Sequence, residues 1–195
     1  MLDTVRYVFA YLTVGSMPFA LGYWYAIHPL VDFWRRLGPV RTYTVMVGLM
    51  ILNLGAAWVW RGPLFAVRYE VGPVHWFVAG AFYVTAVMIE IRCRRHLKFR
   101  TLAGMPELAP ASTPSMLLQE GIYARVRHPR YLAVAFGTLA AAVFCNYLSV
   151  WIVTALTFPG LYGIVLLEES ELRERLGEAY VEYSRRVPRF IPRFG

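Results

Sequence analysis

Charged residues are scarce in this sequence and absent from one long stretch of it. Residues 131–167 are 37 consecutive positions without Asp, Glu, Lys or Arg. Across the chain, 58% of the residues are hydrophobic and the mean hydropathy is +0.46, whereas soluble domains contain about 45–50% apolar residues. A water-soluble core of 195 residues could not bury so much apolar side chain. The composition therefore excludes a soluble globular domain and indicates an integral membrane protein.

Cysteine is almost absent, since the chain contains only Cys93 and Cys145. The helices predicted below put these two residues on opposite membrane faces, so we expect no intramolecular disulfide. Cys93 and His96 stand three residues apart, a spacing that suits a metal ligand pair, but no other Cys or His lies nearby in the sequence to complete a site. We therefore expect no metal site.

Five apolar runs are long enough to cross a bilayer as helices, which takes about 20 residues each. The first three occupy residues 7–27, 43–60 and 74–91. The charge-free stretch is too long for one helix and has Asn146 near its middle, so it predicts a helical hairpin with a turn there. Pro159 and Gly160 fall inside the fifth helix, where a membrane protein tolerates a kink. The predicted fold class is all-α, a polytopic membrane protein with about five transmembrane helices.

The 20 Lys and Arg residues are unevenly divided between the two faces of this arrangement. The loop after the first helix, the connection between the third and fourth helices and the C-terminal tail hold 17 of them, which leaves only Arg6, Arg61 and Arg68 for the other face. Because basic residues accumulate on the cytoplasmic side, we expect the C-terminus to be cytoplasmic. The net charge of +8 then reflects topology and contacts with anionic membrane lipids. Nucleic-acid binding is not expected.

Two polar clusters flank the predicted hairpin on this cytoplasmic face. Arg127, His128 and Tyr131 lie at the start of the fourth helix, and a helix N-terminus with Arg and His beside it can bind an anion. Glu168 and Glu169 follow the fifth helix, and paired carboxylates at a membrane border need a cationic partner. Each cluster also has an ordinary explanation. Arg and Tyr are common at membrane interfaces, and acidic residues are common in the first turn of a solvated helix.

The C-terminal region has a helical pattern of apolar residues. Between residues 168 and 187, apolar side chains recur at three- and four-residue steps, at Leu172, Leu176, Tyr180, Tyr183 and Val187. This spacing predicts one amphipathic helix that lies on the cytoplasmic membrane face and ends before Pro188.

Residues 121–192 contain several short motifs in a specific order. They are Gly121-Ile122-Tyr123, Arg127-His128-Pro129-Arg130-Tyr131, the charge-free hairpin, Glu168-Glu169, Leu176-Gly177-Glu178-Ala179-Tyr180 with Tyr183, and Val187-Pro188-Arg189. Each motif alone is weak, but in this order the segment resembles the isoprenylcysteine carboxyl methyltransferase and phospholipid methyltransferase superfamily. The first three predicted helices carry no matching motif. We therefore divide the chain into residues 1–100, a scaffold and possible acceptor wall, and residues 101–195, a cofactor-binding half.

The resemblance implies that residues 101–195 bind S-adenosylmethionine and that a lipid-like acceptor arrives laterally from the bilayer. Arg127 and His128 would hold the cofactor carboxylate, and Glu168 or Glu169 its ammonium or ribose hydroxyls. The candidate cofactor-binding residues are Tyr123, Arg127, His128, Tyr131, Glu168, Glu169, Tyr180 and Tyr183. Glu169 is the candidate catalytic residue for an amine acceptor, whose proton it would accept. Arg127 and Arg186 are the catalytic candidates for orienting a carboxylate acceptor.

The acceptor and two other functions stay open. The short N-terminal half favours a phospholipid amine over a prenylcysteine carboxylate as acceptor. Sterol reductases end in a similar hairpin and tyrosine-rich tail, which is compatible with a membrane reductase that uses NADPH. In a non-catalytic transporter or scaffold the charged clusters would serve topology only, although transporters more often place ionisable groups at mid-membrane.

Overall fold

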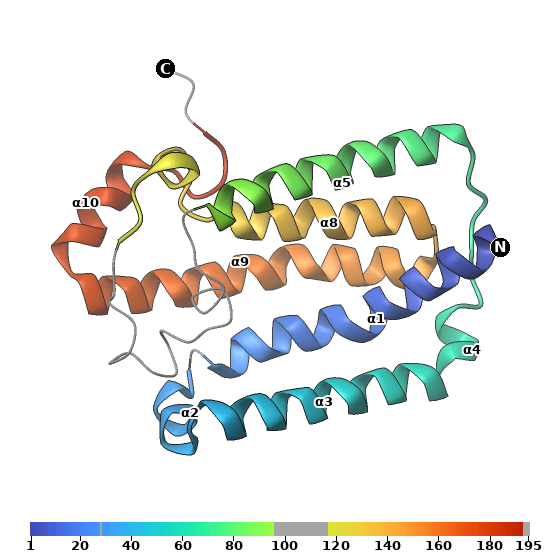
Figure 1. Ribbon diagram of the computed structural model, residues 1–195, viewed down its shortest axis with the longest axis horizontal. Coiled ribbons are helices and arrows are strands. Elements are labelled where there is room, and N and C mark those ends of the chain that lie inside the picture. Colours follow the sequence, from blue (N-terminus) through green and yellow to red (C-terminus); the bar gives the residue numbers. More distant parts are fainter. Residues whose placement is uncertain (28, 96–116, 193–195) are drawn as a thin grey trace.

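The computed structural model describes residues 1–27, 29–95 and 117–192. Five long helices lie side by side in it (Figure 1): α1 (Leu2–Ile27), α3 (Pro39–Val59), α5 (Pro73–Arg94), α8 (Pro129–Cys145) and α9 (Leu148–Leu176). Four short ones lie near their ends: α2 (Val31–Leu37), α4 (Arg61–Leu64), the 3₁₀ helix η2 (Gly121–Ala124) and α10 (Glu178–Arg186). His96 and most of the connection between the third and fourth predicted helices lie outside the described residues.

The long helices coincide with the five apolar runs of the sequence. Among the described residues, α3, α5 and α9 are long and apolar enough to cross a membrane, and α8 is apolar but shorter. Only 11% of the most apolar stretch of α5 is buried, and the Phe77 side chain in that helix is 79% exposed. Apolar helices with such exposed faces indicate an integral membrane protein. The count of five transmembrane helices stays a prediction.

The two halves of the chain share one bundle. α5 packs along α8, α1 packs along both α9 and α8, and α3 packs on α1 (Figure 1). Gly163 of α9 allows this close approach, because a Cβ there would collide with the hydroxyl of Tyr25 in α1. The same hydroxyl donates a hydrogen bond of 2.9 Å to the carbonyl of Gly160, beside Pro159 within α9.

The long helices alternate in direction, so the bundle has two ends (Figure 1). The end that contains the chain N-terminus, residues 65–72 and Asn146 is called the Asn146 end here. Asn146 has a left-handed backbone, with φ 54°, and caps α8, which confirms the predicted turn of the hairpin. The opposite end contains the start of α8, the last turns of α9, and α10, and is called the Glu169 end. Which end faces the cytoplasm stays a prediction.

The prediction of one amphipathic helix over residues 168–187 is wrong. α9 continues through Glu168 and Glu169 to Leu176, and α10 begins only after Gly177. Gly177 has φ 56° and ψ −134°, a conformation that is open to glycine and strained for other residues. The apolar spacing continues across this break, so periodicity alone could not reveal it. The apolar stripe packs inside the protein, where Tyr180, Tyr183 and Val187 form a cluster with Leu117, Leu172 and Leu176.

Candidate functional site

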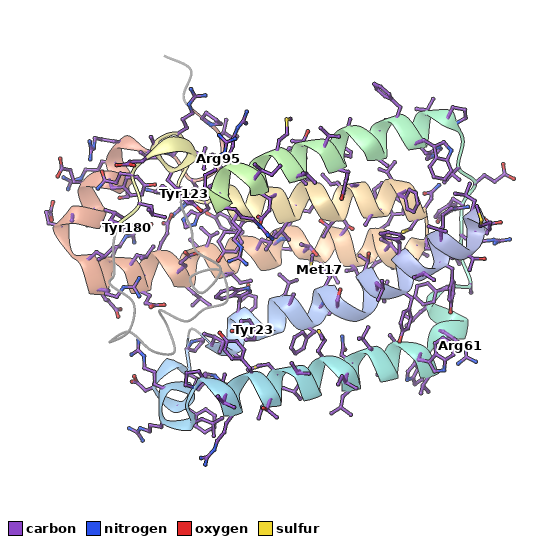
Figure 2. All side chains as sticks on the ribbon, in the orientation of Figure 1. Met17, Tyr23, Arg61, Arg95, Tyr123 and Tyr180 are labelled. Carbon is purple, nitrogen blue, oxygen red and sulfur yellow. The ribbon has the colours of Figure 1, made fainter. Side chains whose placement is uncertain are left out.

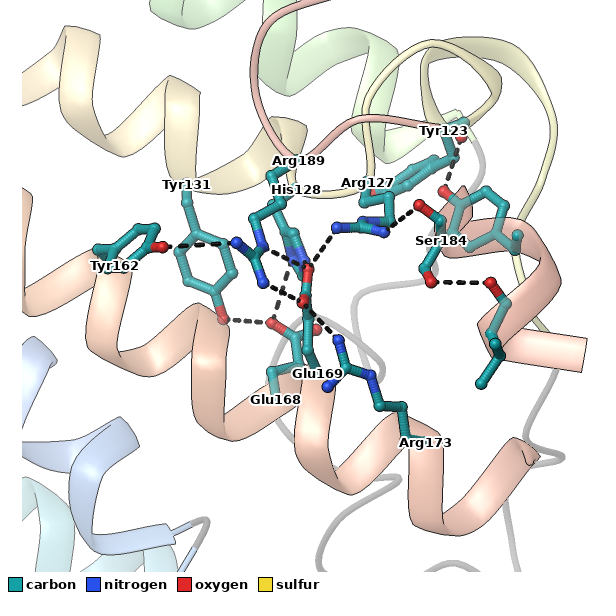
Figure 3. Close-up of polar contacts among 12 residues, drawn as sticks. Tyr123, Arg127, His128, Tyr131, Tyr162, Glu168, Glu169, Arg173, Ser184 and Arg189 are labelled. Atoms are coloured by element: carbon teal, nitrogen blue, oxygen red, sulfur yellow. Dashed lines mark hydrogen bonds and ion pairs between the residues drawn. The ribbon is translucent and has the colours of Figure 1, made fainter. Parts of the chain in front are cut away.

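Three segments that are distant in the sequence meet at the Glu169 end. Pro129 is the first residue of α8, a position where a helix does not need its missing N–H. The residues just before it run beside the C-terminal tail, because the backbone N–H of Arg127 donates to Pro188 O at 2.9 Å and that of His128 to Arg189 O at 3.1 Å. α9 supplies Glu168 and Glu169 from below (Figure 3). The Arg-His-Pro and Val-Pro-Arg motifs and the glutamate pair therefore form one site.

The carboxylate of Glu169 is the centre of this site. Its side chain is 1% exposed, and its Oε1 atom lies 3.0 Å from Arg127 Nη2 and 3.1 Å from His128 Nε2. Arg189 contacts both carboxylate oxygens, with Nε 3.1 Å from Oε1 and Nη2 2.9 Å from Oε2. Arg173, one turn further along α9, lies 3.6 Å from Oε2. These cations compensate the cost of burying the carboxylate.

Glu168 lies beside this network and is more accessible, with a side chain 33% exposed. The hydroxyl of Tyr131 donates to its Oε2 atom at 2.8 Å. His128 Nδ1 lies 3.6 Å from the same oxygen, so the buried imidazole stands between the two glutamates. Tyr131 and His128 thus fix the position of Glu168 and leave part of its carboxylate open.

Three tyrosines pack behind the charged residues. The Tyr183 hydroxyl donates to the carbonyl of Tyr123 at 2.7 Å, and burial raises the pKa of Tyr183 to about 12. The Tyr180 ring lies 6.1 Å from that of Tyr183, centroid to centroid. Burial also raises the pKa values of Tyr123 and Tyr180. All three hydroxyls therefore stay neutral at physiological pH.

Two buried polar atoms at the site have no hydrogen-bond partner among the described residues: Arg127 Nε and the hydroxyl oxygen of Tyr180. Tyr180 is only 1% exposed, and its hydroxyl is close enough to Glu169 and Arg127 to interact electrostatically with both. Buried polar groups in folded proteins are almost always paired. Two unpaired polar atoms beside one charged cluster are therefore consistent with a site where a polar ligand would supply the missing partners.

The site carries more positive than negative charge. Arg127, Arg173 and Arg189 all contact Glu169, and Glu168 is the only other carboxylate of this site among the described residues. The hydrogen bond from Arg189 to Glu169 raises the pKa of that guanidinium. A cluster with surplus guanidinium groups can accept a further anion such as a carboxylate, because Arg binds planar carboxylates through paired hydrogen bonds. The exposed oxygen of Glu168 can at the same time accept from an ammonium or hydroxyl group.

The structure brings together most of the residues that the sequence singles out. Arg127, His128, Tyr131, Glu168 and Glu169 form the polar network, and Tyr180 packs beside it. Tyr123 offers its backbone carbonyl to Tyr183. Arg186 is apart from this network, since its guanidinium lies at the surface and donates to Gln119 at 3.2 Å.

Residue-by-residue reasoning from the sequence missed three side chains of the site. Arg189 belongs to the Val-Pro-Arg motif, but the sequence does not predict its paired hydrogen bonds to Glu169. Arg173 follows Glu169 by four residues, a spacing that places both on one helix face, and this signal could have identified it. Tyr162, whose hydroxyl lies 3.4 Å from Arg189 Nη1, is one of many aromatics in an apolar run and gave no signal.

The chain is similar in part to several characterised proteins. It is 34% identical over 77 residues to the cobalt-zinc-cadmium resistance protein CzcN of Cupriavidus metallidurans, a match that covers 40% of this chain and 36% of CzcN. It is 31% identical over 77 residues to protein-S-isoprenylcysteine O-methyltransferase B of Arabidopsis thaliana, with 39% of each chain covered.

A third relative is the nickel-cobalt-cadmium resistance protein NccN of Alcaligenes xylosoxydans xylosoxydans, 30% identical over 40% of this chain and 36% of NccN. The chain therefore matches little more than a third of the length of these relatives. No family model and no solved structure matches it. These comparisons show a distant and partial similarity to an isoprenylcysteine O-methyltransferase and to two metal-resistance proteins.

Proposed function

We propose that the protein is an integral membrane methyltransferase that moves a methyl group from S-adenosylmethionine to a lipid-like acceptor. The observation that carries the proposal is the convergence of the Arg-His-Pro, Glu-Glu and Val-Pro-Arg motifs on Glu169. The partial similarity to the plant isoprenylcysteine methyltransferase supports the same function. The length and apolar character of α3, α5 and α9, which suit a membrane protein, also support this function, because a lipid-like acceptor is found in the bilayer.

The residues at the site fit the chemistry of S-adenosylmethionine, which carries a carboxylate, an ammonium, a sulfonium and a ribose diol. Arg127 has an unpaired buried Nε that can donate to an anion. The one-third-exposed carboxylate of Glu168 suits an ammonium or a ribose hydroxyl. Tyr180 supplies an unpaired buried hydroxyl beside the charged cluster.

When bound, S-adenosylmethionine would supply an activated methyl group for in-line displacement by the acceptor atom, and its sulfur would leave with the electrons of the broken bond. Such a displacement depends on alignment and on exclusion of water more than on acid–base help. The guanidinium groups would orient the cofactor, and the packed tyrosines would exclude water behind it. An amine acceptor must also lose a proton before or during attack.

The contacts support Glu168 over Glu169 as the acceptor of that proton. Both oxygens of Glu169 are occupied by arginines and His128, and the side chain is almost completely buried. Glu168 is one-third exposed and has an oxygen available beyond its contacts with Tyr131 and His128. In this assignment Glu169 is a positioning residue, which holds Arg127, His128 and Arg189 in place.

The proposal is tested by incubating the purified protein with methyl-labelled S-adenosylmethionine and a total lipid extract. We expect saturable cofactor binding and label in one lipid class, with an aminophospholipid favoured. Glu168→Gln should lower the turnover number for an amine acceptor by at least about 100-fold, the scale of general base catalysis, while cofactor binding changes less than transfer.

Two results would overturn this function. One is saturable NADPH binding by folded protein without binding of S-adenosylmethionine, which would favour a reductase. The other follows from the names of CzcN and NccN. Stoichiometric binding of Co²⁺, Zn²⁺ or Cd²⁺ without cofactor binding would favour a role in metal handling, although no group of three or more His, Cys, Asp or Glu able to hold a metal occurs in the part of the chain that the structure describes.

A further inference from the structure

A surface groove runs between α5 and α8 and ends near the last turn of α5. Its volume is about 410 Å³, and apart from one ion pair its walls are apolar. Its lining includes Ala86 and Ala133, which are both buried, and the more exposed Val87 and Val134. Two small side chains at facing positions of closely packed helices leave room that larger residues would fill. The groove therefore follows from the sequence at these positions.

The ion pair lies at the end of the groove. Arg94 Nε donates to Glu90 Oε1 at 2.8 Å, and the guanidinium is 62% exposed. This bond occupies the Nε side of the guanidinium and directs its two terminal nitrogens elsewhere. Among the described residues no other ion-pair partner of Arg94 occurs. Glu90 thus orients Arg94 as a donor of paired hydrogen bonds, the geometry with which Arg binds phosphate.

The groove joins this guanidinium to the apolar part of the membrane. Ala86 lies eight residues before Arg94, about 12 Å along the helix, and α5 is apolar enough to cross a bilayer. A ligand that fills the groove and contacts Arg94 must combine an apolar chain with an anion at its end. Arg92 and Arg95 are also exposed at this end of α5, and Figure 2 labels Arg95 there. The surplus positive charge adds to the attraction for an anionic group at the membrane surface.

We infer that this groove binds one membrane phospholipid, with an acyl chain between α5 and α8 and the phosphate on Arg94. Resting on the proposed function, we also infer that the bound lipid is the methyl acceptor and that it is an aminophospholipid. Ala133 is one helical turn from Pro129, the residue where α8 leaves His128 and the glutamates. The headgroup end of the groove therefore lies at the same end of the bundle as the proposed cofactor site.

The binding step is tested without cofactor. Delipidated protein in detergent is titrated with phosphatidylethanolamine, phosphatidylglycerol and diacylglycerol of the same chains, and bound lipid is counted by native mass spectrometry. Both phospholipids should bind at one site, and diacylglycerol, which lacks the phosphate, about tenfold more weakly, since a charge-assisted hydrogen bond contributes about that factor. Equal binding of diacylglycerol would overturn the inference.

Two pairs of variants locate the site. Arg94→Gln should weaken phospholipid binding about tenfold, whereas Arg92→Gln, on the same helix end but outside the groove, should change it less than about twofold. Val87→Trp should fill the groove and displace the lipid, and Val84→Trp, one turn away on the exposed surface of α5, should not. Equal effects within either pair would show that the lipid binds elsewhere.

The acceptor role is tested separately by methyl transfer. In Arg94→Gln the KM for phosphatidylethanolamine should rise about tenfold while kcat stays within about twofold, because the variant loses binding of the acceptor and not the chemistry. An unchanged KM with weakened lipid binding would contradict the acceptor role and leave the lipid site established. A wild-type protein that methylates no lipid would contradict the proposed function, whereas the binding titrations would still decide whether the groove holds a phospholipid.

Discussion

The two ends of the bundle both contain a buried arginine, but they use it differently. At the Asn146 end, Arg6 is 6% exposed and donates to backbone carbonyls, at 2.9 Å to Cys145 and 2.8 Å to Tyr69. Asn146 completes this end, since its side-chain amide donates to Glu70 O at 2.7 Å and its oxygen accepts from Trp151 at 3.0 Å. At the Glu169 end, several guanidinium groups converge on one buried carboxylate.

The difference separates a structural use of charge from a functional one. Arg6 ties α1 to the hairpin turn and to the segment before α5, and its guanidinium is matched by acceptors of the protein itself. The Glu169 end holds surplus cations and two unpaired buried atoms, on Arg127 and Tyr180, while one further unpaired hydroxyl among the described residues, that of Ser149, lies at the Asn146 end. Buried polar groups without partners cost stability. The two unpaired atoms beside Glu169 and the surplus guanidinium groups favour the proposed ligand site at that end, whereas the groups around Arg6 are satisfied within the protein.

The largest effect is expected from Glu169→Gln, which removes the negative charge that Arg127 and Arg189 contact. Removal of one partner of a buried ion pair typically costs about 3–5 kcal/mol, because Arg127 is left buried without its carboxylate. Cofactor binding should also fall at least about 100-fold as the guanidinium groups lose their common anchor. Thermal unfolding in detergent and equilibrium binding of S-adenosylmethionine measure the two losses. Glu174→Gln, at an exposed position of the same helix, serves as control.

Arg6→Gln tests the structural role of the buried arginine at the Asn146 end. The carbonyls of Cys145 and Tyr69 lose a charged donor, so stability should fall by about 2–3 kcal/mol. The dissociation constant for S-adenosylmethionine should stay within about twofold, because the contacts of Arg6 are all at the Asn146 end. Arg61→Gln, an exposed arginine on the same end, should change neither quantity. A large loss of cofactor affinity in Arg6→Gln would show that the two ends are not independent.

The helices could be predicted from the sequence because each depends on local composition. Apolar runs placed the five long helices, and Asn146 marked the hairpin turn, since a short polar residue tolerates the left-handed backbone. Pro129 marked the start of α8 for an equally local reason. The break at Gly177 was missed because the apolar spacing continues through it. A glycine inside a helical pattern gives the same signal whether the helix continues or ends.

The candidate site was predictable only in part, because its contacts are non-local. The motifs indicated Arg127, His128 and Glu169, but nothing in the sequence says that Arg189 returns to pair with Glu169 across the tail. Arg186, three residues earlier in the same basic region, is a residue that the sequence suggests for orienting a carboxylate acceptor. The fold places these two arginines differently. α10 directs the Arg186 side chain to Gln119 at the surface, whereas the hydrogen bond from His128 N–H to the carbonyl of Arg189 holds Arg189 at the site.

A moderate effect is expected when these two arginines are compared. Arg189→Gln should weaken binding of S-adenosylmethionine about tenfold, the cost of about 1.4 kcal/mol, because Glu169 loses the fork that holds both its oxygens. Arg186→Gln should change binding less than about twofold. Isothermal titration with each purified variant measures both values. If Arg186→Gln has the larger effect, the tail in the cofactor complex differs from the tail described here.

The smallest effect concerns Tyr180 and Tyr183, two of the three tyrosines behind the charged cluster. Tyr183→Phe loses the hydrogen bond to the carbonyl of Tyr123 and should destabilise the protein by about 1 kcal/mol, with little change in cofactor binding. Tyr180→Phe removes a hydroxyl that has no partner among the described residues. Its stability should therefore stay level or rise, while cofactor binding weakens a few-fold. Thermal unfolding and binding titrations of both variants distinguish a structural hydroxyl from one that contacts a ligand.

Alkaline pH provides an independent measure of the Tyr183 hydroxyl. An unfolded tyrosine titrates near pH 10, whereas burial raises the pKa of Tyr183 to about 12. Between these values the unfolded chain binds fewer protons than the folded one, so stability must fall as the pH rises from about 10 to 12. Tyr183→Phe should show a shallower fall than wild type. An equal slope in both proteins would mean that this hydroxyl is not held neutral in the folded state.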